Sequence, residues 1–218
     1  MIAAVLWDND GMLVDTESLF FEITRLTLAE TGAALTPEYW ARHYLGEGKS
    51  SREIAAALGL AEPELERVLA RCNERYRRRL RETIPLRPGV RETLQSLRGR
   101  VRLALVTGSS LESLRLMHQH TGLLPFFECL VTSDLYEKSK PHPDAYLAAL
   151  RRLGLPADRC LAVEDSPRGL AAATAAGLRC VLVPTELTAL DLCPPHTCIQ
   201  ADATAVLRLI DGGQWPGA

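Results

Sequence analysis

Acidic, hydroxyl and ammonium side chains end four apolar runs of this 218-residue chain or stand in the loops that follow them. If these runs are parallel strands, their carboxyl ends meet at one edge of a sheet, where open α/β folds bind their ligands. We therefore expect the polar groups to share one crevice. The four segments are Asp8-Asn9-Asp10-Gly11, Thr107-Gly108-Ser109-Ser110, Lys138-Ser139-Lys140-Pro141 and Glu164-Asp165-Ser166.

These groups suit the transfer of a phosphoryl group. Clustered carboxylates such as Asp8, Asp10 and Asp165 repel one another unless a hard cation joins them, and an all-oxygen ligand set favours Mg²⁺. One carboxylate can attack phosphorus to give an aspartyl-phosphate, and a second can protonate the leaving oxygen and later take a proton from water. Thr107, beside the backbone N–H groups of a helix N-terminus, can hold phosphoryl oxygens, and Lys140 adds a fixed positive charge.

Each segment also has an ordinary structural interpretation. Asp and Gly are common in turns, so the segment after the first run could be a turn alone. The segments around Thr107 and Glu164 could only cap the helices that follow them, and most lysines, Lys140 included, would be expected on the surface. The coincidence of all four segments at predicted strand ends favours a functional site over these separate roles.

The apolar runs themselves are short and continuous, which is typical of strands in a parallel sheet that helices cover on both faces. Predicted helices alternate with them, and the last has Ser166 as N-cap and Gly177 as its end. This alternation predicts an α/β fold with a doubly wound, Rossmann-like parallel sheet. The predicted strands are Ala3 to Trp7, Val101 to Thr107, Cys129 to Thr132, Cys160 to Glu164 and Arg179 to Val183. The predicted helices are Gly89 to Leu97, Ser109 to His120, Pro143 to Leu153 and Pro167 to Ala176.

One long interval, 16–83, contains no predicted strand but has apolar residues at helical spacing. The simplest account is a small α-helical cap domain inserted after the first strand. We therefore divide the chain into a catalytic core, residues 1–15 and 84–218, and a helical cap, residues 16–83. The arginine-rich end of the cap, from Arg71 to Arg81, is more simply a solvated helix face than a basic binding patch.

The four segments, in this order, resemble the motifs of the haloacid dehalogenase superfamily of aspartyl-phosphate hydrolases. The placement of the insertion is similar to that in the subfamily with a helical cap, the beta-phosphoglucomutase and phosphoglycolate phosphatase group. The likeness runs from residue 4 to about residue 183. The segments that carry it are Trp7-Asp8-Asn9-Asp10-Gly11-Met12-Leu13-Val14-Asp15-Thr16-Glu17, Val106-Thr107-Gly108-Ser109, Lys140-Pro141-His142-Pro143-Asp144 and Val163-Glu164-Asp165-Ser166-Pro167-Arg168-Gly169.

The resemblance implies a role for each motif residue. Asp8 would be the nucleophile and a Mg²⁺ ligand, and Asp10 the general acid and base, which would bind Mg²⁺ through its backbone carbonyl. Asp165 would complete the protein's share of the metal ligands, with Glu164 beside it. The phosphoryl group would be held by the segment that contains Thr107, Gly108 and Ser109, and by Lys140. The family usually has an apolar residue between the two aspartates and Thr after the glycine, whereas this chain has Asn9 and Met12.

Relatives of other activity differ from this chain at particular positions. Dehalogenases and phosphonoacetaldehyde hydrolases replace the second aspartate, so Asp10 argues against both. The sugar-phosphate mutases usually carry a histidine in the first cap helix, where this chain reads Glu17-Ser18-Leu19-Phe20-Phe21. We therefore expect a phosphatase acting on a small phosphorylated metabolite such as a sugar or polyol phosphate. A beta-phosphoglucomutase type of mutase is the alternative, and a non-catalytic phospho-accepting or binding module is a remote one.

Substrate specificity is expected to come from the cap. The loop Gly46-Glu47-Gly48-Lys49-Ser50-Ser51-Arg52 is polar and lies between predicted cap helices. Lys49 or Arg52 could contact a second anionic group or the hydroxyls of a sugar. It is equally consistent with the sequence that Arg52 only begins a helix and that Lys49 is solvated.

Composition excludes several classes of protein. The 25 basic and 27 acidic side chains leave a formal net charge of −2, so no global field favours nucleic acid or an anionic membrane. No apolar run is long enough to span a bilayer, and the first residues lack the basic region of a signal peptide. The six cysteines form no C-x-x-C pair and do not indicate a disulfide framework. We expect a cytoplasmic protein that is a monomer or a weak homodimer.

Overall fold

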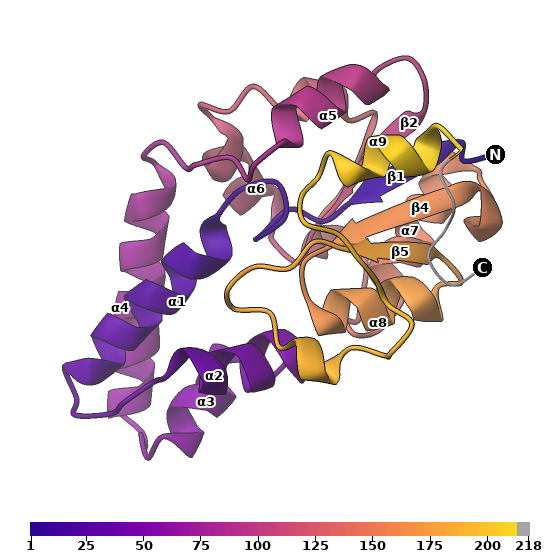
Figure 1. Ribbon diagram of the computed structural model, residues 1–218. Coiled ribbons are helices and arrows are strands. Elements are labelled where there is room, and N and C mark those ends of the chain that lie inside the picture. The colour runs from indigo at the N-terminus through magenta and orange to yellow at the C-terminus, as the bar shows by residue number, and fades with distance from the viewer. Residues whose placement is uncertain (213–218) are drawn as a thin grey trace.

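The predicted strands pair in parallel, and a short sixth strand joins them at one edge. Within residues 1–212, the part of the chain that the computed structural model describes, the sheet has the order β3-β2-β1-β4-β5-β6. Helices cover both of its faces (Figure 1), so the predicted α/β fold is confirmed. The strands are β1 (Ala4–Trp7), β2 (Arg102–Val106), β3 (Cys129–Val131), β4 (Cys160–Glu164), β5 (Arg179–Leu182) and β6 (Cys198–Ile199). The sequence did not predict β6, because two residues are too short for a recognisable pattern.

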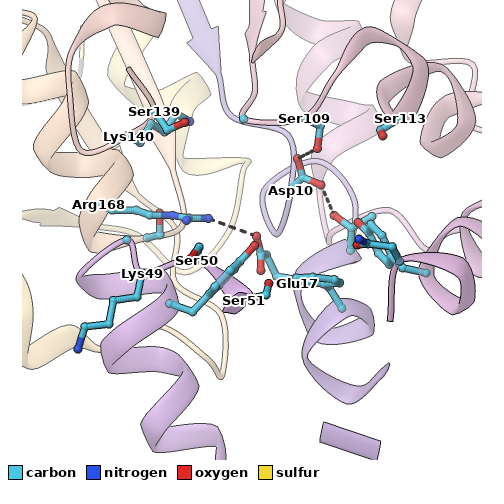
Figure 2. Close-up of a pocket in the computed structure, with 18 of the residues that line it drawn as sticks. Asp10, Glu17, Lys49, Ser50, Ser51, Ser109, Ser113, Ser139, Lys140 and Arg168 are labelled. Atoms are coloured by element: carbon cyan, nitrogen blue, oxygen red, sulfur yellow. Dashed lines mark hydrogen bonds and ion pairs between the residues drawn. The ribbon is translucent and has the colours of Figure 1, made fainter. Parts of the chain in front are cut away.

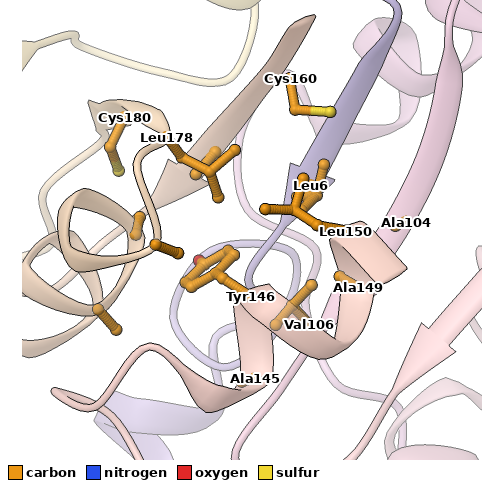
Figure 3. Packing of buried hydrophobic residues seen from close by; sticks show 14 of the residues in the cluster. Leu6, Ala104, Val106, Ala145, Tyr146, Ala149, Leu150, Cys160, Leu178 and Cys180 are labelled. Atoms are coloured by element: carbon orange, nitrogen blue, oxygen red, sulfur yellow. The ribbon is translucent and has the colours of Figure 1, made fainter. Parts of the chain in front are cut away.

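Alternate residues of each central strand enter separate hydrophobic clusters on the two faces. Leu6 lies on the face covered by α7 (Asp144–Leu153) and α8 (Pro167–Ala175), where Tyr146 is fully buried against the sheet (Figure 3). Trp7 lies on the opposite face, which is covered by α5 (Val90–Leu97), α6 (Leu111–His118) and α9 (Ala205–Ile210). Burial on both faces explains why the strands read as continuous apolar runs.

The helices that follow β2 and β4 begin at side-chain caps. The Ser110 hydroxyl accepts a hydrogen bond from the Ser113 N–H, and Ser166 accepts one from the Gly169 N–H, as predicted for an N-cap. Pro167 occupies the first position of α8, and Gly177, at a φ of +81°, follows its end. Both helices therefore start at the edge of the sheet where the polar segments lie.

Residues 16–83 form only helices and loops and have a hydrophobic cluster of their own. The helices are α1 (Thr16–Ala29), α2 (Pro37–Trp40), a π-helical segment (Ala41–Gly46), α3 (Ser51–Ala57) and α4 (Glu64–Leu80). Their cluster centres on Trp40, Leu45 and Ile54, which are almost completely buried. The chain segments that enter and leave this insertion lie side by side. The Asp15 N–H donates to the Pro85 carbonyl over 3.1 Å, and Val14 forms an antiparallel β-bridge with Leu86. The boundaries that we gave the cap stay a prediction.

The loop after β5 contacts the inserted helices. Leu187 packs into the hydrophobic cluster of the insertion, and Asp191 forms an ion pair of 2.7 Å with Arg42. The Thr188 hydroxyl of the same loop donates to the backbone carbonyl of Asp165 over 2.7 Å. This loop therefore links the insertion to one of the polar segments at the strand ends.

Two expectations from composition can be compared with the structure. The six cysteines, all within the described residues, are free thiols, which agrees with the absence of a disulfide framework. Over residues 1–212, no helix combines the length and the apolar character needed to cross a bilayer.

Candidate active site

The polar segments meet because of the strand order. β1 pairs with β2 on one side and with β4 on the other, so Asp8 follows the central strand and Thr107 and Asp165 lie after its two neighbours. The loop that follows β3, the strand beyond β2, brings Lys140 into contact with Asp8. Four segments that are distant in the sequence thus contribute to one site, as predicted from the strand ends.

Lys140 is the centre of a buried ion cluster. Its ammonium donates to Asp8 Oδ1 over 2.5 Å and to Glu164 Oε1 over 2.6 Å, and its side chain is only 8% exposed. Burial lowers the pKa of Lys140, but attraction to the two carboxylates outweighs it, so the pKa lies above its ordinary value. Tyr146 also donates to Glu164 Oε1, over 2.5 Å. This tyrosine was not predicted as a site residue.

Asp8, Glu164 and Asp165 form a cluster of carboxylates in which the nearest oxygen atoms all lie within 4.8 Å of one another. Burial raises the pKa of Asp8 to about 8, against the opposing charge of Lys140, and burial also raises the pKa of Asp165. Within the described residues, Asp165 Oδ2 and Glu164 Oε2 are buried without a hydrogen-bond partner. When all three are ionised, the carboxylates exceed the single ammonium by two negative charges, so the residues present fit a divalent cation with oxygen ligands.

Asp10 is oriented by hydrogen bonds instead of belonging to this carboxylate cluster. Its Oδ1 accepts from the Thr16 hydroxyl over 2.8 Å. Its Oδ2 accepts from the Thr107 hydroxyl over 2.9 Å. The same oxygen accepts from the Ser109 hydroxyl over 3.1 Å (Figure 2). The two hydroxyls expected to bind a phosphoryl group therefore contact Asp10 in this structure. No side-chain metal contact is expected of Asp10, and its backbone carbonyl as a ligand stays a prediction.

A cavity of about 910 Å³ opens beside these groups, between the sheet edge and the inserted helices. Asp8, Asp10 and Lys140 line it, together with Gly108 and Ser109. The insertion lines the cavity with aromatic side chains and with residues at the start of α3 and just before it. These residues include Phe20, Tyr44, Tyr76, Lys49, Ser50 and Ser51.

The two cap residues that we predicted to contact substrate lie differently. Lys49 lines the cavity, but its ammonium pairs with Glu47 at 2.9 Å and points away from Asp10 (Figure 2). Arg52 does not line the cavity: its guanidinium is hydrogen-bonded to Glu62 and Glu66 near the start of α4. The structure therefore brings Lys49 to the edge of the site and leaves Arg52 outside it, because two carboxylates hold Arg52 on the surface.

Glu17 and Arg168 belong to the site but were not predicted as site residues. They point toward one another at the cavity wall (Figure 2), with Arg168 Nη2 3.7 Å from Glu17 Oε1, and the Arg168 guanidinium lies 4.9 Å from the ring centre of Tyr44. Glu17 is 7% exposed, its Oε2 has no hydrogen-bond partner among the described residues, and burial raises its pKa to about 7. Both residues stand inside the quoted motifs, Glu17 directly after Thr16 and Arg168 two positions after Ser166, and this placement was a signal that could have been used.

Comparison with known proteins agrees with this geometry. Residues 5–183 match the family described as haloacid dehalogenase-like hydrolase. A phosphorylated carbohydrates phosphatase of Thermotoga maritima is 34% identical over 184 residues, which cover 80% of this chain and 82% of the relative. Hexitol phosphatase B of Escherichia coli is 30% identical over 200 residues, with 84% of each chain covered. The crystal structure of CbbY from Rhodobacter sphaeroides in complex with xylulose-(1,5)bisphosphate superposes with a TM-score of 0.76 at 28% identity, covering 94% of this chain and 96% of that one.

Proposed function

Since this chain belongs to the haloacid dehalogenase-like hydrolase family, we propose that it is a Mg²⁺-dependent phosphatase that hydrolyses a small sugar or polyol phosphate through an aspartyl-phosphate on Asp8. One observation carries the proposal. At the cavity wall, Asp8 forms an ion pair with Lys140 and shares a carboxylate cluster with Asp165, and Asp10 lines the same cavity. A nucleophile, a cation, a metal-binding carboxylate and an acid are the groups that phosphoryl transfer to a carboxylate requires.

The side chains of Asp8, Asp165 and Glu164 would hold the metal ion, and the backbone carbonyl of Asp10 is a further expected ligand. Asp165 and Glu164 each have a buried carboxylate oxygen without a hydrogen-bond partner within the described residues, which supports this assignment. When bound, the ion supplies positive charge that offsets the repulsion between a carboxylate nucleophile and an anionic phosphate.

The first chemical step forms a bond between a carboxylate oxygen of Asp8 and phosphorus while the bond from phosphorus to the alcohol oxygen breaks. Lys140 favours the ionised form of Asp8 against the effect of burial and meets the charge of the transferring group. Thr107 and Ser109 turn from Asp10 to the phosphoryl oxygens. Asp10 gives its proton to the leaving alcohol oxygen.

In the second step water attacks the phosphorus of the aspartyl-phosphate, and Asp10 takes the proton that the water loses. The Asp8 carboxylate and inorganic phosphate are released. The inserted helices, whose aromatic residues line the cavity, would limit the access of bulk water to this intermediate.

Glu17 favours a hydroxylated substrate. Glu17 lines the cavity, and its carboxyl group, which has one oxygen without a hydrogen-bond partner among the described residues, can accept a hydrogen bond from a substrate hydroxyl. The relatives named above are described as phosphatases of carbohydrate and hexitol phosphates. A small phosphorylated metabolite that carries hydroxyls fits this site, whereas nucleic acid and membrane surfaces are not expected partners. A cytoplasmic location and a monomeric or weakly dimeric state remain expectations.

The proposal is tested by measuring phosphate release from a panel of sugar phosphates, polyol phosphates and phosphoglycolate in the presence of Mg²⁺. The wild type should release phosphate, and Asp8→Asn should not. A wild type no more active than Asp8→Asn on every ester would overturn the proposal. Conversion of a sugar phosphate into its isomer without phosphate release would instead identify a mutase. Glu17→Gln should lower kcat/KM for the best polyol phosphate by about tenfold and have less effect on phosphoglycolate, which has no hydroxyl.

A further inference from the structure

Asn9 is a buried polar residue at a position where the family usually has an apolar one. It is completely buried between the two aspartates of the first loop. Its Oδ1 lies 2.7 Å from His118 Nε2, and its Nδ2 lies 3.3 Å from Asp10 Oδ2 and 3.2 Å from Met117 Sδ. Asn9 thus connects Asp10 to the last turn of α6, more than 100 residues away in the sequence.

The carboxylate of Asp10 fixes which way the Asn9 amide points. An ionised carboxylate oxygen only accepts, so the Asn9 NH₂ group faces Asp10 Oδ2. Asn9 Oδ1 therefore faces His118 Nε2, which carries the ring proton and donates to it over 2.7 Å. His118 Nδ1 is then the acceptor of the Thr121 hydroxyl at 2.8 Å, and Thr121 Oγ1 accepts from the Leu123 N–H.

The ring is neutral near pH 7, which agrees with this arrangement. His118 is 4% exposed, and burial lowers its pKa to about 4. A buried polar chain of this kind costs free energy unless every member is hydrogen-bonded, and an apolar residue at position 9 would avoid that cost. Packing alone therefore does not account for the asparagine.

Asn9 differs from the other donors to the same oxygen. Asp10 Oδ2 accepts from Thr107, Ser109 and Asn9, and the first two are the residues proposed to bind the phosphoryl group. When their hydroxyls turn to the phosphoryl oxygens, Asn9 is the donor to Oδ2 that stays, since His118 holds its other end. The carboxyl group of Asp10 then keeps its orientation at the moment when it must deliver a proton.

We propose that Asn9, held by His118, is a positioning residue that orients Asp10 for proton transfer to the leaving oxygen. This inference rests on the proposed function, in which Asp10 is the general acid. The proton passes from the Asp10 carboxyl to the alcohol oxygen as the bond from that oxygen to phosphorus breaks. Asn9 takes no part in the transfer itself.

The test compares two phosphate monoesters with different leaving groups. An alkyl alcohol leaves only with a proton from an acid, whereas p-nitrophenolate leaves without one. Asn9→Leu should lower kcat/KM for glycerol phosphate, or for the best alkyl ester of the panel, by about tenfold or more. For p-nitrophenyl phosphate the change should stay within about twofold. The constant kcat/KM is used because it reports the steps up to transfer to Asp8 and excludes the later attack of water.

Matched variants separate positioning from packing. Met117→Leu changes a residue that touches the same Asn9 amide and should leave both substrates unaffected. His118→Leu should reproduce Asn9→Leu, and His118→Gln, which can still donate to Asn9 Oδ1, should restore most of the activity on the alkyl ester. If His118→Leu fails to fold, Asn9→Leu and His118→Gln still decide the question. Melting temperatures are measured for every variant.

Each outcome has a definite meaning. An equal loss on both esters would show that Asn9 has only a structural role, and no loss on either would show that it has no role in proton transfer. Both results would overturn the inference while the wild-type activity keeps the proposed function intact. A wild type inactive on both esters would overturn the proposed function, and the positioning role with it.

Discussion

Lys140 and Asp8 are 132 positions apart in the sequence, yet the ammonium of one donates to the carboxylate of the other over 2.5 Å. Their side chains are each 8% exposed, so water screens the contact little. Glu164 approaches the same ammonium to 2.6 Å from the next strand of the sheet. One lysine thus neutralises part of a carboxylate cluster and stands beside the atom proposed to attack phosphorus.

Replacing Lys140 with methionine should lower kcat by about 100-fold or more, because the cation beside the transferring phosphoryl group is lost. Lys140→Arg should not restore activity, since a planar guanidinium is larger than an ammonium that fits between two buried carboxylates. Phosphate release under saturating substrate and Mg²⁺ measures the effect. Lys138→Met is the control, because Lys138 is exposed on the same loop. A Lys140→Met enzyme with more than about half of the wild-type kcat would contradict the role given to Lys140.

Mg²⁺ should raise the melting temperature of the wild type. A ligand at about 100 times its Kd stabilises the folded state by about 2.7 kcal/mol. Asp165→Asn should abolish most of this effect, because it removes one of the three clustered carboxylates. Asp158→Asn, in an exposed turn before β4, should respond to Mg²⁺ like the wild type. Thermal unfolding with increasing Mg²⁺ measures both, and an equal response of Asp165→Asn and the wild type would count against the metal site.

The residues at the strand ends could be predicted because topology alone brings them together. Once β1 lies between β2 and β4, Asp8 must lie near Thr107 and Asp165 whatever their side chains do. Local residue patterns predicted the other five strands and the N-cap at Ser166. They did not predict β6, because a strand of two residues shows no recognisable pattern.

Side-chain partners could not be predicted, because they depend on distances across the fold. Thr107 and Ser109 were expected to face an open phosphate site, but each donates to Asp10 here. Arg168 reaches Glu17 from a different element, and nothing in the local sequence of either residue shows that contact. Arg52 was a candidate for substrate binding on its residue type, yet two glutamates near the start of α4 bind it first.

His118 should contribute a loss of stability in acid, opposite in sign to the contribution of Asp8 and Glu17, whose pKa values are raised. Its pKa is about 4 in the folded chain, compared with 6.5 for an ordinary histidine. Between these values the unfolded chain binds a proton that the folded chain does not, so the free energy of unfolding falls as the pH drops from about 6.5 to about 4. The loss should reach about 3 kcal/mol.

Urea unfolding at about pH 7 and about pH 4.5, without divalent metal, is compared for the wild type and His118→Gln, and the difference between their changes measures this loss. His118→Gln should lose less stability between the two pH values than the wild type, since its amide does not titrate. His142→Gln, an exposed histidine elsewhere on the surface, serves as the control and should behave like the wild type. If His118→Gln and the wild type lost the same free energy, the buried neutral histidine would not be the cause.

Gly169→Ala should destabilise the protein, although the same change in a helix commonly stabilises it by about 0.5–1 kcal/mol. A Cβ at this position of α8 would overlap the carboxyl group of Glu164. That carboxyl group cannot easily move aside, because it is completely buried and accepts hydrogen bonds from Lys140 and Tyr146. Either α8 shifts away from the sheet or Glu164 leaves its partners, and we expect a loss of about 1–3 kcal/mol with weaker Mg²⁺ binding.

Ala171→Gly, at an exposed position of the same helix, separates the overlap from helix propensity. It should cost about 1 kcal/mol and leave the Mg²⁺ affinity unchanged. The two variants are compared by thermal unfolding with and without Mg²⁺. A Gly169→Ala protein as stable as the wild type, with the same response to Mg²⁺, would mean that Glu164 is free to move. In that case Glu164 would not be held in place for a metal ion by its contacts with Lys140 and Tyr146.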